Sequence, residues 1–255
     1  MKTIFLFLTS LFLLSTAAAQ QPAPDKSLAA NQSDPCQSLQ QRNQQLSAKL
    51  RDWPNLSQYR EADAQLGPPA KGESRVVFLG DSITQMWDLA ASFPGKPYVN
   101  RGISGQTTPQ ILLRFRQDVI ALQPKTVVIL AGTNDIAENT GPTTLAAIED
   151  NLISMVELAQ KNSIRVILAS LLPAARYPWH PEIQPAEKIQ ALNRWIKDYA
   201  AHTGIDFLDY YTVMAEPKFD PKSALSPDLS DDGVHPNHAG FALMTQLAAR
   251  EIEKK

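Results

Sequence analysis

The sequence predicts an α/β fold, a three-layer α/β/α sandwich in which helices cover both faces of a five-stranded parallel sheet. The first observation is a set of five short apolar segments, at residues 75–79, 98–100, 126–130, 164–169 and 205–208. Continuous apolar runs are typical of strands that are buried on both faces. The second observation is that helical segments separate these strands, which is the pattern of a parallel sheet built from βαβ units.

Four amphipathic segments are the predicted helices. They lie at residues 108–121, 143–161, 186–202 and 237–253, where apolar side chains recur at helical spacing. Parallel sheets of this kind bind ligands at the carboxyl ends of their strands. The polar residues that directly follow the strands are therefore the candidates for chemistry.

The first residues are predicted to be a secretory signal peptide, residues 1–19, rather than part of the fold. Lys2 is followed by an apolar run at residues 4–14 and by alanines at residues 17–19, which gives a charged start, a hydrophobic stretch and a cleavage site. About 11 apolar residues are too few to span a bilayer, which needs roughly 20, so cleavage is favoured over a retained anchor. The mature protein is expected to be secreted or periplasmic, without a stable membrane anchor.

The rest of the chain is predicted to divide into an appendage and one main domain. Residues 20–71 are interpreted as a polar leader and a helical N-terminal appendage, with short helices at residues 36–50 and 56–66. A Gly-Pro-Pro linker then leads into the main domain, residues 72–255.

Composition excludes several classes of protein. With 44% hydrophobic residues and 11 glycines among 255 residues, the chain is neither disordered nor collagen-like. A net charge of −2 lacks the basic surplus of a nucleic-acid-binding protein, so no nucleic-acid partner is expected. The single cysteine, Cys36, excludes an intramolecular disulfide and a multi-cysteine metal site. It is interpreted as a spare thiol or an intermolecular link.

Three polar motifs follow the first three predicted strands. Residues 80–82 read Gly-Asp-Ser, and Ser82 is expected to open a helix, where it could also act as a plain helix cap. Gly102 and Gly105 flank the next turn and could expose backbone N–H groups, although an ordinary glycine turn is the alternative and the lysine of a phosphate-binding loop is absent. Asn134 offers a side-chain donor at the same sheet edge, or else an Asx turn or cap.

A fourth motif precedes the last predicted helix and contains two aspartates and two histidines. A nucleophilic serine needs a base to take its proton, and that imidazole needs a partner to hold its tautomer. His235 could supply the base and Asp232, three residues before it on the same short turn, its partner. His235 and His238 also have a spacing that suits a metal site, but a clear third ligand is missing, and His238 is expected to begin the helix.

In this order the four motifs resemble the SGNH, or GDSL-type, hydrolase family, over residues 75–247. The resemblance implies a flavodoxin-like α/β/α fold and a serine esterase that is similar to platelet-activating-factor acetylhydrolases and other acylhydrolases. It further implies that Ser82 is the nucleophile and His235 the general base and then acid. The spacing within the family selects Asp232, rather than the neighbouring Asp231, as the partner of His235.

The resemblance also implies an oxyanion hole. Its donors would be the backbone N–H groups of Ser82 and Gly105, with Gly102 as the alternative glycine, and the side chain of Asn134. Such donors are required where negative charge develops in the tetrahedral intermediate. No cofactor and no metal are expected, because the serine supplies its own nucleophile and base.

The expected function is hydrolysis of short-acyl carboxylic esters outside the cytoplasm, with carbohydrate O-deacetylation as the leading physiological role. The partner is then a small-molecule or glycan ester, and the oligomeric state is not predicted. A lysophospholipase or thioesterase of the same family, a metal-dependent phosphoesterase and a catalytically silent glycan-binding domain are the alternatives. The proline-rich residues 173–185, with Tyr177 and Trp179, could form a wall of the substrate site or an ordinary surface loop.

Overall fold

The computed structural model describes residues 35–216 and 223–254. The predicted signal peptide and most of the predicted leader lie outside the described residues. Residues from Ala48 onward form one compact unit, and the residues up to Ser47 form another. Helix α1 (Pro35–Arg51) spans the junction, and the fold described below is that of the unit that begins at Ala48.

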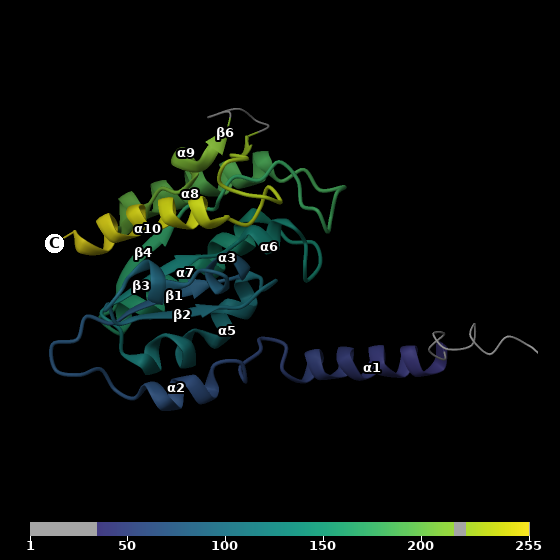
Figure 1. Cartoon of the computed structure of the whole chain (residues 1–255), viewed down its shortest axis with the longest axis horizontal. Coiled ribbons are helices and arrows are strands. Elements are labelled where there is room, and N and C mark those ends of the chain that lie inside the picture. The colour runs from purple at the N-terminus through teal and green to yellow at the C-terminus, as the bar shows by residue number, and fades with distance from the viewer. Residues whose placement is uncertain (1–34, 217–222, 255) are drawn as a thin grey trace, which may run out of the picture. The chain divides into compact units, whose positions relative to one another are not determined.

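Five parallel strands form the central sheet in the order β2-β1-β3-β4-β5 (Figure 1). Their bounds are β1 Val76–Gly80, β2 Tyr98–Gly102, β3 Thr126–Leu130, β4 Arg165–Ala169 and β5 Asp206–Leu208. The predicted α/β class and five-stranded parallel sheet are confirmed. Strand β2 runs two residues beyond the predicted segment, because Arg101 and Gly102 pair in register with the last two residues of β1. Polar residues are tolerated there, since β2 is an edge strand.

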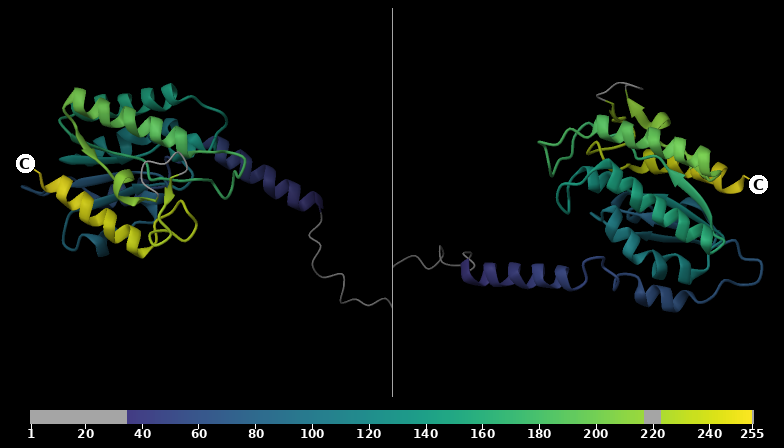
Figure 2. Two further views of the ribbon diagram at one scale, coloured as in Figure 1. Left: turned by 90° about the horizontal axis from the view of Figure 1, so that it is seen from above. Right: turned by 180° about the vertical axis from the view of Figure 1, so that it is seen from behind.

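Helices cover both faces of the sheet. On one face α7 (Leu145–Lys161) lies between α5 (Thr108–Asp118) and α8 (Ala186–Thr203), and the rear view in Figure 2 shows the three side by side. On the other face lie α10 (His238–Glu253) and the short α4 (Leu89–Ser92). The helix predicted at residues 108–121 is divided into α5 and a separate 3₁₀ turn at Ile120–Leu122.

Alternate residues of each strand enter two separate hydrophobic cores. In β1, Val77 and Leu79 pack towards α5, α7 and α8, whereas Val76 and Phe78 pack towards α10. All four side chains are buried. A strand that is buried on both faces must be apolar at every position, which explains the continuous apolar run in the sequence.

The remaining elements are short. They are α2 (Arg60–Leu66), α3 (Ser82–Gln85), α6 (Thr133–Ile136), α9 (Tyr211–Met214) and a small hairpin of β6 (Ala215–Glu216) and β7 (Ala224–Leu225). The second appendage helix begins at Arg60, later than predicted, because the Asp52 carboxylate accepts the N–H groups of Leu56 and Ser57 and holds a turn there. None of the helices within the described residues is both long and apolar enough to cross a membrane.

The order of the strands brings three loops together. The chain leaves β1 for β2 on one side and returns to β3 on the other side of β1. This reversal is a topological switch point, where open α/β sheets form a crevice at the carboxyl ends of the strands. The loops after β1, β2 and β3, which carry the first three polar motifs, meet at this crevice.

Candidate active site

Ser82 is the first residue of α3 and directly follows the turn at the end of β1. Only glycine fits at position 80, because a Cβ there would lie 2.3 Å from Thr84 Oγ1 and 2.5 Å from the carbonyl oxygen of Leu130. The cap of α3 is Asp81, whose carboxylate accepts the N–H of Ile83 at 3.0 Å. The capping role considered for Ser82 therefore falls to its neighbour.

The Ser82 hydroxyl faces an imidazole from the loop that precedes α10. Ser82 Oγ lies 2.9 Å from His235 Nε2, and His235 Nδ1 lies 2.7 Å from Asp232 Oδ2. The second carboxylate oxygen of Asp232 accepts the backbone N–H groups of Val234 at 2.9 Å and His235 at 2.8 Å. One carboxylate thus orients both the imidazole and the backbone that carries it.

Hydrogen bonds within the turn that carries Asp232 and His235 stabilise its conformation. Ser230 Oγ donates to the carbonyl oxygen of His235 at 2.6 Å and accepts the N–H of Gly233 at 3.0 Å. Gly233 has φ +80°, in the left-handed region that favours glycine. Asp231 is directed elsewhere, and its carboxylate lies 3.5 Å from Asn237 Nδ2. The hydrogen-bond partner of His235 is therefore Asp232.

The Asp232 carboxylate is strongly acidic in the folded protein. Burial raises its pKa, but the hydrogen bonds from the His235 ring and from the N–H groups of His235 and Val234 outweigh burial and lower the pKa to about 2. Asp232 is consequently ionised at neutral pH. An ionised partner at Nδ1 keeps the proton on that nitrogen and leaves Nε2 as the acceptor of the Ser82 hydroxyl.

Of the two candidate glycines, Gly102 at the end of β2 and Gly105 in the loop that follows, Gly105 has the available backbone donor. It has φ +76°, and within the described residues its N–H donates to no protein group. The N–H of Gly102 instead donates to Asn100 Oδ1 at 2.9 Å. A Cβ at Gly102 would lie 2.2 Å from the backbone nitrogen of Gln85, so this glycine serves close packing.

Asn134 is buried inside α6, whose N-cap is Gly132, so the Asx-turn and cap alternatives are wrong. Its Nδ2 donates to the carbonyl oxygen of Gln106 at 3.1 Å, and its Oδ1 accepts from Asn139 Nδ2 at 2.8 Å. An amide nitrogen carries two hydrogens. Gln106 takes one of them, and the other makes no hydrogen bond within the described residues.

Asn139 was not singled out from the sequence, and the structure places it at the centre of this network. Its Nδ2 donates to the carbonyl oxygen of Gly105 at 3.2 Å as well as to Asn134. Its Oδ1 accepts the indole N–H of Trp179 at 3.0 Å. The only signal in the sequence is its position five residues after Asn134, where it follows the short helix α6.

The proline-rich residues 173–185 place an aromatic pair beside the candidate catalytic residues. Trp179 stacks on Tyr177 with ring centroids 5.2 Å apart, and its ring lies 6.1 Å from that of His235. Tyr177 is fully buried, and its hydroxyl lies 2.9 Å from Thr133 Oγ1. The loop is therefore anchored by one aromatic ring and presents the other beside the imidazole.

Two buried charged side chains hold the loops of the site together. Arg114 is fully buried and donates to the carbonyl oxygen of Gly80 at 2.8 Å and to Gln106 Oε1 at 2.6 Å. Asp135 accepts the N–H of Thr108 at 2.9 Å and its hydroxyl at 2.6 Å. The loop after β2 is thus tied to the end of β1 through Arg114 and to α6, the helix that follows β3, through Asp135.

Asp81 is fully buried, and we expect it to make the stability of the protein depend on pH. Burial, the largest influence, raises its pKa to about 7, although the hydrogen bond from Ile83 and the nearby His235 oppose this shift. Between the carboxyl pKa of the unfolded chain, roughly 4, and pH 7, the folded state holds a proton that the unfolded state releases. The free energy of unfolding therefore falls as pH rises across this range.

Asp81→Asn keeps an oxygen for the Ile83 N–H and removes the titration. We expect the loss of unfolding free energy between pH 4 and pH 8 to be smaller in this variant, by on the order of a few kcal/mol, as measured by urea denaturation at each pH. Asp88→Asn is the matched control, because exposed Asp88 caps α4 through the N–H of Ala91. Equal slopes in Asp81→Asn and wild type would contradict the role given to Asp81.

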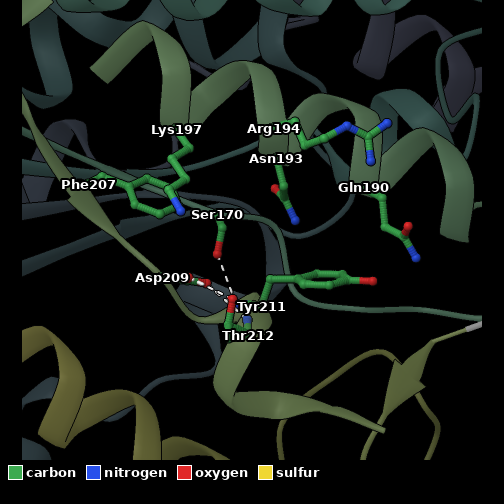
Figure 3. A pocket seen from close by; sticks show the side chains of 9 residues that line it. All are labelled: Ser170, Gln190, Asn193, Arg194, Lys197, Phe207, Asp209, Tyr211 and Thr212. Atoms are coloured by element: carbon green, nitrogen blue, oxygen red, sulfur yellow. Dashed lines mark hydrogen bonds between the residues drawn. The ribbon is translucent and has the colours of Figure 1, made fainter. Parts of the chain in front are cut away.

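Two hollows lie near the carboxyl edge of the sheet. The larger, about 670 Å³, is lined by Gly105 and Asn139 among others. The second, about 310 Å³, lies between α8 and the segments that follow β4 and β5; Figure 3 shows Ser170, Lys197 and Tyr211 around it. The second hollow contains none of the candidate catalytic residues. Within the described residues, no group of three or more His, Cys, Asp or Glu side chains could hold a metal ion.

The fold and this polar cluster at its switch point define an α/β hydrolytic enzyme. Residues 78–243 match the GDSL-like Lipase/Acylhydrolase family, and the chain belongs to that family. It is a carboxylic ester hydrolase.

Three similar proteins illustrate the relationship. The crystal structure of a GDSL-like lipase from Bacteroides thetaiotaomicron is 47% identical, with a TM-score of 0.75, and the match covers 78% of this chain and 98% of that one. An acetylxylan esterase of Geobacillus stearothermophilus is 30% identical over 174 residues, 64% of this chain and 76% of the relative. The uncharacterized lipoprotein YqeF of Bacillus subtilis is 32% identical over 126 residues, 42% of this chain and only 52% of the lipoprotein.

Proposed function

We propose that the protein is a serine esterase that hydrolyses short-acyl esters through Ser82, His235 and Asp232. The observation that carries this proposal is the hydrogen-bonded series from Ser82 Oγ to His235 Nε2 at 2.9 Å and from His235 Nδ1 to Asp232 Oδ2 at 2.7 Å. These are the contacts that a serine needs to lose its proton and that an imidazole needs to hold its tautomer.

The reaction follows from these contacts in two halves. In the first, His235 Nε2 takes the hydroxyl proton while Ser82 Oγ bonds to the ester carbonyl carbon, and the protonated imidazole then gives the proton to the departing alcohol. In the second, His235 takes a proton from water, the resulting hydroxide attacks the acyl-enzyme, and the proton returns to Ser82 as the acid leaves. Asp232 stays ionised and stabilises the imidazolium.

We assign stabilisation of the negative charge that develops on the carbonyl oxygen to three hydrogen-bond donors. These are the backbone N–H groups of Ser82 and Gly105 and the free N–H of the Asn134 side chain. Each such donor typically contributes a factor of about 10²–10³ to turnover. Asn139 fixes the orientation of the Asn134 amide, because it occupies Asn134 Oδ1 and leaves Nδ2 to act as the donor.

The proposed substrates are esters of small acids, with O-acetylated carbohydrates as the leading class, and the proposed location is outside the cytoplasm. The predicted signal peptide supports the location, and so does the similarity to a protein described as a lipoprotein. The similarity to an acetylxylan esterase supports the substrate class. A lysophospholipase or thioesterase activity is the second candidate that the family allows.

A series of esters with one alcohol and acyl chains of two to sixteen carbons tests the substrate class. We expect kcat/KM to be highest for acetate and to fall at least about tenfold by eight carbons, because eight of the twelve residues that line the pocket beside the candidate site are polar and would lose water to a long hydrocarbon chain. Rates are measured by pH-stat titration of the released acid. A preference for long chains would favour the lipolytic alternative instead.

A further inference from the structure

The 670 Å³ pocket shares residues with the candidate active site and with the N-terminal segment at residues 48–57. Gly105 and Asn139 line it from the site, and Asp52 and Trp53 line it from the segment. Its volume lies within the range of roughly 300–1,000 Å³ that is common for small-ligand sites. A pocket that contains Gly105 is placed to receive the part of the substrate next to the ester carbonyl.

The segment that forms this wall is held in place by specific hydrogen bonds. Three glutamine side chains donate to its backbone carbonyl groups: Gln106 to Pro54 at 2.7 Å, Gln110 to Trp53 at 2.8 Å and Gln117 to Leu56 at 2.6 Å. The Asp52 carboxylate closes the turn by accepting the N–H groups of Leu56 at 2.7 Å and Ser57 at 2.9 Å. The wall is therefore formed before a ligand arrives, which lowers the entropic cost of binding.

The chemistry of the lining favours a neutral, hydroxyl-rich ligand. Eight of the twelve lining residues carry polar side chains, and Asp52 carries a carboxylate. A hydrocarbon chain would strip water from these polar side chains without replacing their hydrogen bonds, and an anionic group would be repelled by Asp52. Hydroxyl groups can donate to the carboxylate and exchange hydrogen bonds with the Asn55 amide. The Trp53 indole, 38% exposed, offers a flat apolar surface for the C–H face of a sugar ring.

We propose that this pocket binds the alcohol portion of the ester, that this portion is a carbohydrate, and that Trp53 is the surface on which a sugar ring stacks. The inference rests on the proposed esterase function and extends it from the acyl group to the leaving group. It also makes residues 48–57, which the sequence assigned to an appendage, a specificity-determining part of the substrate site.

The first test compares two acetate esters that differ in the alcohol, acetylated xylo-oligosaccharides and ethyl acetate. We expect Trp53→Ala to lower the ratio of kcat/KM for the oligosaccharide to that for ethyl acetate about tenfold, mainly through KM, with Trp53→Phe in between. Leu113→Ala removes an exposed apolar side chain of α5 that does not line the pocket, and it should leave the ratio unchanged. Thermal melts of all variants check that they fold.

Two kinetic outcomes would overturn the inference. The first is a ratio in Trp53→Ala that equals the wild-type ratio, whether both rates fall or neither does. The second is a loss confined to esters with longer acyl chains, which would show that the pocket holds the acid portion.

A second test separates this inference from the proposed function. Unacetylated xylo-oligosaccharide is titrated calorimetrically into wild type, Ser82→Ala and Trp53→Ala. We expect equal affinity for wild type and Ser82→Ala, and an affinity at least about tenfold lower for Trp53→Ala. Binding that is absent from wild type, or unchanged in Trp53→Ala, would refute the carbohydrate pocket even if Ser82 proves to be the nucleophile. Tryptophan-dependent binding together with full activity of Ser82→Ala would refute the nucleophile and leave the pocket standing.

Discussion

Replacement of Ser82 by alanine should reduce kcat for acetate esters by about five to six orders of magnitude. The change removes the proposed nucleophilic oxygen, while the proposed oxyanion donors and His235 remain in place. A serine–histidine–aspartate set acts as a unit, so loss of the serine removes its catalytic contribution. The activity that remains should come only from substrate binding and stabilisation of the oxyanion.

The fold of Ser82→Ala should be intact. Within the part of the chain that the structure describes, the hydroxyl hydrogen-bonds with His235 alone, and loss of a single such bond costs about 1 kcal/mol. We therefore expect a thermal midpoint within a few degrees of wild type. Ser154→Ala is the matched control, since Ser154 is half-buried on α7 and donates only to a backbone carbonyl. Ser82→Ala with activity comparable to that control would rule out Ser82 as the nucleophile.

Asp232→Asn should be the next most damaging change, with kcat lower by about 10⁴. The asparagine amide can place an N–H towards His235 Nδ1, which moves the imidazole proton to Nε2 and removes the acceptor for the Ser82 hydroxyl. KM should change little, because Asp232 is assigned no contact with substrate. Steady-state kinetics on one soluble acetate ester measures both parameters.

Asp231→Asn is the matched control for Asp232, because it changes the adjacent carboxylate, which lies 3.5 Å from Asn237 and does not contact the His235 ring. We expect its kcat to stay within about twofold of wild type, because substitutions of exposed side chains that lie outside hydrogen-bond networks and packed cores generally have small effects. Equal losses in the two variants would mean that the turn as a whole, rather than the carboxylate of Asp232, supports the imidazole.

The sheet was predictable because its strands are buried on both faces. Val76, Val77, Phe78 and Leu79 must all be apolar, and such a run is visible without a structure. The end of β2 was not predictable in the same way. Arg101 and Gly102 carry no strand signal, and they are extended only because β1 lies beside them.

The candidate site was predictable to the extent that its residues follow strands or share a turn. Motif position at one sheet edge pointed to Ser82 and Asn134, and the three-residue spacing pointed to Asp232 with His235. The structure places Ser82, His235 and Asp232 in one hydrogen-bonded series, and their catalytic roles remain a proposal.

Two contributors to the site could not be anticipated from the chain. Asn139 acts through its side-chain contacts with Asn134, Gly105 and Trp179, which depend on how three separate loops pack. Trp53 falls within residues 20–71, which the sequence predicts to be a leader and a helical appendage. Trp53 lines the pocket because hydrogen bonds from Gln106 and Gln110 hold its segment there, and these contacts are visible only in the structure.

The central claim is that Ser82 becomes covalently bonded to the acyl group, and an active-site-directed organophosphate tests it most directly. The protein is treated with diethyl 4-nitrophenyl phosphate, its intact mass is recorded, and the modified peptide is sequenced by mass spectrometry. We predict one diethylphosphoryl group per chain, located on Ser82, with loss of esterase activity in proportion to labelling and full activity retained in EDTA. Labelling of another residue, or an enzyme that resists the organophosphate and is inactivated by EDTA, would contradict the account.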